Sequence, residues 1–324
     1  MNLRRFFAAL PVALILALAG YAVGPNAEPH AVVQMAGLIL PSATPTATNT
    51  ATPTATPTQT STPTNTATPT PTFTPTPTRT PPPTATRDPN LRGLRVPILM
   101  YHYISVPPPD ADKYRLDLSV TPANFEAQME YLAVEGFTPI TVSDLAAHLL
   151  YGAPLPPKPI ALTFDDGYMD NYQYAFPVLK KYKFTATFNV ITDFIDGKRP
   201  GYMTWNNLEE LAMEGMEIGS HTISHPDLNR KSRAFQLNEI AGSKTIIESR
   251  IGTPVQTFTY PAGNYDATTL DVLRQAGFVA ALSEIQGTRQ STDNLLELRR
   301  IRIRGSYAVA EFGYWLKYFM TYSK

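Results

Sequence analysis

Residues 42–86 form a threonine- and proline-rich stretch that confines any folded domain to the rest of the chain. The stretch repeats Thr-Pro, Ala-Thr and Pro-Thr, and Phe73 is its only large apolar side chain. It can bury too little apolar surface to offset the entropy of ordering a chain. Closely spaced prolines favour extended polyproline II, so the stretch would act as a semi-rigid spacer of up to roughly 140 Å, at about 3.1 Å per residue. We therefore assign residues 25–88 to a disordered Thr/Pro-rich linker, with a composition typical of an O-glycosylated stalk.

Residues 1–24 are predicted to be an export segment. Arg4 and Arg5 precede an apolar run from Phe6 to about Val23, and a positive start before an apolar core is typical of a signal sequence. Ala17-Leu18-Ala19 would serve as a cleavage site. The run also reaches the lower limit of about 17–18 residues for spanning a bilayer. A cleaved signal peptide and an uncleaved membrane anchor both stay open, and either predicts an extracytoplasmic protein, secreted or held at the cell surface.

The charge and cysteine content exclude several classes of protein. The 324 residues have a formal net charge of zero and no long basic run, so nothing indicates a nucleic-acid partner. The chain has no cysteine, which rules out disulfides, thiolate zinc sites, a cysteine nucleophile and a lipid anchor on cysteine. Any metal site must use histidine and carboxylate ligands.

Strand-like runs alternate with helical patterns through residues 89–324, which we assign to one domain. Such alternation is typical of an α/β fold with a parallel sheet. About seven or eight strands in about 235 residues favour a closed or partly closed β/α barrel. The expected strands are 96–101, 137–140, 160–164, 186–190, 216–219, 257–260, 278–282 and 298–303. The expected helices begin at Thr121-Pro122 and at Ser143, and cover 172–183, 205–214, 232–250, 266–275 and 309–318.

Polar side chains follow several of these strands directly, where the chemistry of a β/α barrel lies. They are His102, the pair Asp165-Asp166, the stretch His221–His225, and Pro261–Gly263. The carboxyl ends of parallel strands share one rim, so we expect these residues to meet there.

The acidic pair and the two histidines together predict a metal site. A spacing of i, i+4 would place His221 and His225 on one side of a helical turn, as in zinc sites. Alone, each pattern has an ordinary explanation, since Asp-Gly is common in turns and histidines are common on surfaces. Together, two histidines and one carboxylate with an open position form a catalytic zinc arrangement. The second carboxylate would then take a proton from water bound to the metal.

These motifs resemble those of the polysaccharide deacetylase family (the NodB-homology domain, carbohydrate esterase family 4). The resemblance rests on Thr163–Gly167 (Thr-Phe-Asp-Asp-Gly) and on His221–His225 (His-Thr-Ile-Ser-His). Phe258–Gly263 is similar to a variant form of the family's third motif, and the similarity covers about residues 91–305. The opening Pro97–Tyr103 resembles the subgroup of poly-N-acetylglucosamine deacetylases.

The resemblance implies a distorted (β/α)₇ barrel that removes acetyl groups from N-acetylated sugars with a divalent metal. Carried over, Asp165 would be the general base. Asp166, His221 and His225 would bind the metal, with Zn²⁺ expected and Co²⁺ or Ni²⁺ as alternatives. The backbone N–H of Ala262 would hold the oxyanion, at a position where the family usually has tyrosine, and Tyr260 and Pro261 are assigned with Ala262 to the substrate and oxyanion site.

The sequence departs from the family pattern at two positions. Thr259 stands where the third motif commonly begins with an arginine that orients the catalytic aspartate, and no positive charge is adjacent. The pKa of Asp165 is therefore expected to depend mainly on the metal and on local hydrogen bonds. The late Leu-x-His motif is also absent, because Leu298–Ile301 reads Leu-Arg-Arg-Ile and no histidine follows His225. His102 is then the candidate general acid.

Three functions remain open on these residues. The first is hydrolysis of acetamido groups on N-acetylglucosamine-containing cell-wall or exopolysaccharide. The second is a weak or silent glycan-binding domain on a stalk, and the third is an O-acetyl esterase on xylan-like glycans. In each case the expected partner is a polysaccharide, and residues 1–24 would contact a membrane if uncleaved. Six aromatic residues could stack on sugar rings, or belong to the core or rim: Tyr103, Tyr168, Tyr202, Trp205, Tyr260 and Tyr265.

Overall fold

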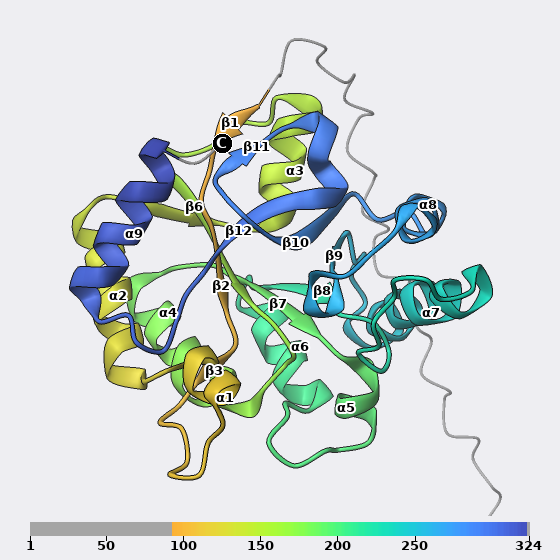
Figure 1. Ribbon diagram of the computed structural model, residues 1–324, viewed down its shortest axis with the longest axis horizontal. Coiled ribbons are helices and arrows are strands. Elements are labelled where there is room, and N and C mark those ends of the chain that lie inside the picture. The colour runs from red at the N-terminus through yellow and green to blue at the C-terminus, as the bar shows by residue number, and fades with distance from the viewer. Residues whose placement is uncertain (1–92, 323–324) are drawn as a thin grey trace, which may run out of the picture. The chain divides into compact units, whose positions relative to one another are not determined.

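The computed structural model describes residues 93–322, whose helices and strands are shown in Figure 1. The predictions for residues 1–24 and for the linker 25–88 lie outside the described residues. Between residues 93 and 322, no helix combines the length and the apolar character that a membrane span requires.

Seven parallel strands close into a ring at the centre of the domain (Figure 1). Their order is β2-β12-β10-β9-β8-β7-β6, and β6 pairs back onto β2. The predicted distorted (β/α)₇ barrel is confirmed. The ring strands are β2 (Ile98–Tyr101), β6 (Pro159–Phe164), β7 (Thr187–Val190), β8 (Glu217–Ser220), β9 (Thr257–Thr259), β10 (Ala280–Gln286) and β12 (Leu298–Arg302).

The ring is distorted at two places. Strand β5 (Thr138–Ile140) pairs with the first half of β6, and β7 pairs with its second half. Between β10 and β12 the register shifts, because Leu282 lies opposite Leu298 while Gln286 lies opposite Arg300. Two short pairings lie outside the ring, β1 (Leu94–Arg95) with β11 (Arg289–Gln290) and β3 (Tyr103–Ile104) with β4 (Ser119–Val120).

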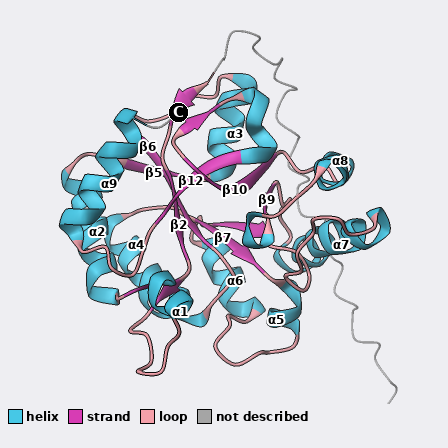
Figure 2. Ribbon diagram, viewed as in Figure 1, coloured by secondary structure: helices cyan, strands magenta, loops and turns pink. Residues whose placement is uncertain are grey.

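Helices surround the strands (Figure 2). The α-helices are α1 (Lys113–Leu118), α2 (Pro122–Val134), α3 (Val142–Tyr151), α4 (Phe176–Tyr182), α5 (Thr192–Asp196), α6 (Trp205–Met213), α7 (Arg233–Ile251), α8 (Ala267–Gln275) and α9 (Val309–Tyr322). A π-helical turn covers Asn171–Ala175, and 3₁₀ turns cover Pro261–Gly263 and Thr292–Glu297.

Several helices begin where capping residues predict. The Thr121 side chain accepts a hydrogen bond from the Asn124 N–H, with Pro122 at the first helical position, which is the expected N-cap arrangement. One predicted start is wrong. Thr141, not Ser143, caps α3, and the Ser143 hydroxyl instead donates to the Glu217 carboxylate.

The strands bury apolar residues under the helices and polar residues within the ring. All four residues of β2 are buried, and so are Thr163 on β6, Asn189 on β7 and Arg300 on β12. The Thr163 hydroxyl donates to the Leu99 carbonyl over 2.7 Å. Buried polar groups need such partners. The candidate site lies at the carboxyl ends of these strands.

Candidate active site

Three side chains that follow β6 and β8 come together as a group of metal-ligand type. Asp166 Oδ1 lies 3.4 Å from His221 Nε2 and 3.4 Å from His225 Nε2. The two Nε2 atoms are 3.2 Å apart. For bonds of about 2.0–2.1 Å, tetrahedral ligands lie about 3.4 Å from each other. The three ligand atoms therefore have the mutual spacing that a zinc-type cation requires, and this is the only such group of three among residues 93–322.

The orientation of His221 is fixed by a backbone carbonyl. Its Nδ1 lies 2.8 Å from the Thr259 carbonyl oxygen, so Nδ1 carries the hydrogen and Nε2 is the nitrogen that faces Asp166. Histidine ligands are commonly oriented through the second ring nitrogen in this way. Thr259 thus contributes its carbonyl to the site, although it stands where the family has an arginine.

The two histidines are joined by a turn, so the predicted helical placement is wrong. Thr222 and His225 have positive φ angles of 69° and 60°, and no helix covers them. The Thr222 hydroxyl accepts the His225 N–H at 2.9 Å, a local bond that competes with helix formation. Glu239 of α7 closes the turn, because its carboxylate accepts the N–H groups of Ile223 and Ser224 at 3.0 and 2.9 Å.

The electrostatics of the group suit a cation. Burial, and then the charge of His221, lower the pKa of His225 to about 4, so His225 is neutral near pH 7. Burial alone would raise the pKa of Asp166, but hydrogen bonding to His221 and the nearby histidines hold it well below its usual range. The ionised Asp166 and the neutral His225 are in the ligand state that a divalent metal needs. For His221, burial acts to lower the pKa, but hydrogen bonding to Asp166 and the charges of both aspartates raise it, so a metal bound there would displace a proton from this ring.

Asp165 is bound by a buried arginine, which corrects the expectation that no positive charge lies nearby. Arg300 Nη1 donates to both carboxylate oxygens of Asp165, at 3.0 and 2.8 Å, and both side chains are almost inaccessible to solvent. The Asn189 amide donates to the same carboxylate at 2.8 Å. Burial raises the pKa of Asp165, but Arg300, His221 and His102 together bring it below its usual value.

The irregular register of β10 helps to place Arg300. The Ser283 carbonyl, within the shifted part of β10, accepts the Arg300 Nε–H at 2.9 Å. The Thr163 hydroxyl accepts from Nη1 at 3.3 Å. Irregular pairing next to active sites commonly redirects a side chain. These bonds hold the buried Arg300 guanidinium within hydrogen-bond distance of Asp165.

Gly219 is required for the close packing around Asn189. A Cβ at this position would overlap the Asn189 Oδ1 and lie 2.9 Å from the Thr257 hydroxyl. We expect Gly219→Ala to lower the free energy of unfolding by about 1–3 kcal/mol, as overpacking does, and to lower activity by displacing Asn189 from Asp165. Denaturant melts would measure the first effect. If Gly219→Ala lowers stability clearly less in the Asn189→Ala background, where only the contact with Thr257 remains, the clash with Asn189 is confirmed. An equal loss in both backgrounds would contradict it.

His102 lies on the same rim, directly after β2. Its carbonyl accepts the Asn171 side-chain amide at 2.7 Å, and its Nδ1 is buried without a hydrogen-bond partner among the described residues. Burial lowers the pKa of His102, against the opposing effects of Asp166 and Asp165.

The Tyr260 side chain, in the third motif, is engaged by residues outside the metal-ligand group. The Tyr260 hydroxyl donates to the Leu296 carbonyl at 2.6 Å, and its ring stacks on Tyr265 with centroids 4.4 Å apart. Pro261 is buried, whereas Ala262 is exposed and has a left-handed backbone (φ 51°, ψ 21°). The predicted oxyanion role of the Ala262 N–H stays a prediction.

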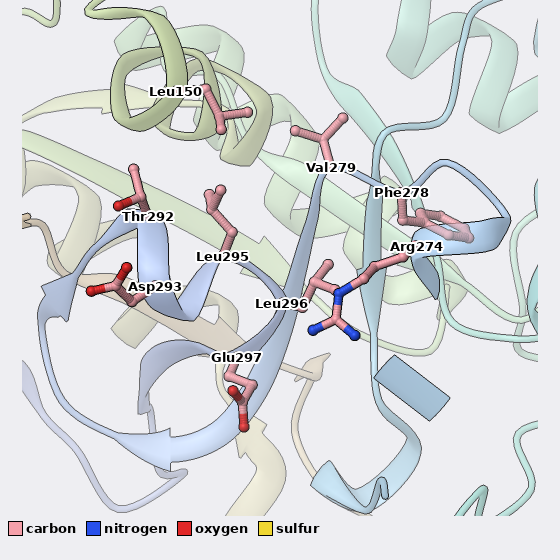
Figure 3. Close-up of a pocket in the computed structure, with 9 residues that line it drawn as sticks. All are labelled: Leu150, Arg274, Phe278, Val279, Thr292, Asp293, Leu295, Leu296 and Glu297. Carbon is pink, nitrogen blue, oxygen red and sulfur yellow. The ribbon is translucent and has the colours of Figure 1, made fainter. Parts of the chain in front are cut away.

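A separate pocket of about 240 Å³ does not include these residues (Figure 3). Leu150, at the end of α3, lies across from the Thr292–Glu297 turn, and Arg274 and Glu297 lie at one side. None of the predicted site residues lines it, so the candidate chemistry lies elsewhere.

Comparison with known proteins places this barrel among the deacetylases of polysaccharides. A model of the polysaccharide deacetylase family matches residues 152–281. YxkH of Bacillus subtilis (strain 168), a protein assigned to polysaccharide deacetylases, is 32% identical over 223 residues, covering 69% of this chain and 76% of that protein. A poly-β-1,6-N-acetyl-D-glucosamine N-deacetylase of Staphylococcus aureus (strain MSSA476) is 25% identical over 189 residues, covering 54% of this chain and 65% of that protein.

A solved structure supports the same assignment. The Streptococcus pyogenes deacetylase PplD, determined in complex with acetate, superposes with a TM-score of 0.65 at 31% identity, over 71% of this chain and 100% of that chain. The chain described here belongs to the polysaccharide deacetylase family, the hydrolases of carbohydrate esterase family 4.

Proposed function

We propose that this protein hydrolyses acetamido groups on an N-acetylglucosamine-containing polysaccharide, using a divalent metal. The observation that carries the proposal is the ionised Asp165, held by Arg300 and Asn189 beside the group of Asp166, His221 and His225. The relative named as a poly-β-1,6-N-acetyl-D-glucosamine N-deacetylase supports the substrate class.

Asp166, His221 and His225 would hold the metal, with Zn²⁺ first and Co²⁺ or Ni²⁺ as alternatives. A cation bound there would supply Lewis-acid polarisation of the acetyl carbonyl and would acidify water. The donor set of one carboxylate and two imidazoles, with ligand atoms 3.2–3.4 Å apart, supports this assignment.

Asp165 would take the proton from the attacking water. Arg300 keeps the carboxylate ionised, and its bonds to both oxygens fix the direction of the free lone pairs. As the water oxygen bonds to the carbonyl carbon, the Ala262 N–H would hold the developing oxyanion. The C–N bond then breaks, and the proton that Asp165 took from the water would pass by way of His102 to the departing amine, which gives acetate and the free amino sugar.

The proposed setting is outside the cytoplasm. Residues 1–24 carry the export pattern and residues 25–88 the spacer composition, so the barrel would act at a distance from a membrane or be released. Two relatives are named as poly-β-1,6-N-acetyl-D-glucosamine N-deacetylases. These names support a substrate outside the cell.

The proposal predicts that the purified protein binds one divalent metal and releases acetate from β-1,6- or β-1,4-linked N-acetylglucosamine oligomers. Metal analysis and an acetate assay across a glycan panel would measure both, with O-acetylated xylan as a comparison. Chelation should abolish release and Zn²⁺ or Co²⁺ should restore it. Absence of acetate from every N-acetylated glycan in the presence of metal would refute the proposal. Release from xylan alone would favour the esterase, and glycan binding without release would favour the silent binder.

A further inference from the structure

Glu239 is an acidic residue at a buried position of α7. It belongs to the buried face of this helix and is only 4% exposed. Burial disfavours an ionised carboxylate unless hydrogen-bond donors or cations compensate for the lost water. Among residues 93–322, the donors to this carboxylate are the Ile223 N–H, the Ser224 N–H and the Ser224 hydroxyl. The buried charge is therefore directed at the segment between the two histidine ligands.

This segment is held from two sides. One carboxylate oxygen of Glu239 accepts both N–H groups, and the other accepts the Ser224 hydroxyl at 2.9 Å. On the other side, the first two N–H groups of α5 donate to the carbonyls of Thr222 and Ile223, at 3.3 and 3.0 Å. The backbone donors and acceptors of the turn are thus fixed by partners outside it, which is what a segment without regular structure needs when it is buried.

Two more residues of α7 contact the same region. A Cβ at Gly242 would lie 2.7 Å from the Ile223 Cδ1, so the helix approaches the turn closely at this position. The Ser243 hydroxyl lies 2.6 Å from the hydroxyl of Ser220, at the end of β8. Residues at i, i+3 and i+4 share one face of a helix. One face of α7, beginning at Glu239, therefore contacts both the end of β8 and the turn that follows it.

His225 depends on this contact more than the other two ligands do. Asp166 and His221 follow strands closely, and the His221 ring is also fixed by the Thr259 carbonyl at 2.8 Å. His225 has a φ of 60°, a conformation that residues other than glycine keep only where the surroundings enforce it. We propose that Glu239 is a positioning residue that holds His225 in the geometry of a ligand, so that the affinity for the metal depends on α7. The inference rests on the proposed metal site.

Zinc affinity measured with the full-length protein, by competition with a chromophoric chelator, tests this role. Glu239→Met removes all three hydrogen bonds and leaves two N–H groups of the turn without their acceptor. Residues that orient a ligand without touching the metal commonly contribute about 10- to 100-fold in affinity, and we expect the Kd for Zn²⁺ to rise by that factor. Glu239→Gln should recover most of the loss, because its amide oxygen can accept the two N–H groups and the Ser224 hydroxyl can accept from its NH₂.

Glu248→Met is the matched control on the same helix. The Glu248 carboxylate also accepts a backbone N–H, that of Val255 at 2.9 Å, but this bond holds the loop after α7 and not the turn between the ligands. The Kd for Zn²⁺ should stay at the wild-type value. Hydrogen exchange of the metal-free proteins gives a second measurement: the amides of Ile223 and Ser224 should exchange faster in Glu239→Met and at the wild-type rate in Glu248→Met.

A His225→Ala background separates positioning from a general loss of fold. The turn then carries no ligand, so Glu239→Met should leave the weaker zinc affinity of that background unchanged. An equal loss of affinity in both backgrounds, or an unchanged Kd when Glu239→Met is made in the wild-type protein, would overturn the inference and leave the proposed function standing. A wild-type protein that binds no Zn²⁺ would reject the metal site itself, and this inference with it.

Discussion

Replacing Arg300 with methionine is expected to lower the free energy of unfolding by about 3–5 kcal/mol, because the change leaves the buried Asp165 carboxylate without its partner. The methionine also cannot bond the Ser283 carbonyl or the Thr163 hydroxyl, both of which now accept from Arg300. We further expect kcat for acetate release to fall about 10²-fold, since misplacement of a catalytic group by about 1 Å has an effect of that size. Urea denaturation and initial rates would measure the two effects.

The double variant Asp165→Asn/Arg300→Met separates the ion pair from packing. Removing both charges relieves the unpaired state, so the double variant should be more stable than either single variant while remaining inactive. Arg302→Met is the matched control on the same strand. Its ion pairs with Glu284 and Asp117 are partly exposed, and such pairs contribute about 0–1 kcal/mol. Additive losses in the double variant would contradict a coupled Arg300–Asp165 pair.

The sequence predicts the barrel because its signals are local and repeated. Several ring strands, such as β2 and β6, are short apolar runs, and helical patterns with capping residues separate the strands, as at Thr121-Pro122 and Ser232. The parallel arrangement then brings the residues after β6 and β8 to one rim, so Asp166, His221 and His225 could be grouped from sequence. The shape of the turn between the histidines could not, because it depends on Glu239, which lies on α7.

Arg300 was missed because its partner is 135 residues away in the sequence. Leu298–Arg302 reads Leu-Arg-Arg-Ile-Arg, and nothing local distinguishes the buried arginine from the two that reach solvent. Which arginine faces the ring depends on the register shift against β10. The available signal was indirect: a carboxylate buried at the end of β6, with no cation in its own motif, requires one from another strand.

Short and irregular elements were also missed. Helices α1 and α5 have six and five residues, too few for a periodic pattern, and β3 and β4 have two each. The π-helical turn Asn171–Ala175 reads as ordinary helix in sequence, and such turns are frequent at functional sites. Asn171, the first residue of this turn, donates its side-chain amide to the His102 carbonyl.

The two adjacent aspartates should give opposite results when each is replaced by asparagine. Asp165→Asn should keep one metal per chain while kcat falls about 10²–10⁴-fold, the usual contribution of a general base. Asp166→Asn should lose both the metal and the activity, because Oδ1 of Asp166 is the oxygen that faces both histidine Nε2 atoms. Metal analysis after gel filtration and acetate assays on both variants would measure this.

The thermal shift caused by added metal tests the same assignment of the two aspartates without an activity assay. A ligand at about 100 times its Kd stabilises the folded state by about 2.7 kcal/mol, so added Zn²⁺ should raise the Tm of the wild-type protein and of Asp165→Asn, and leave that of Asp166→Asn unchanged. Asp165→Asn will start from a lower Tm, because Arg300 is then unpaired, and the comparison must use the increment produced by metal. Equal increments in both variants would mean that the aspartates share the metal, and the assignment of Asp165 as a free base would have to be withdrawn.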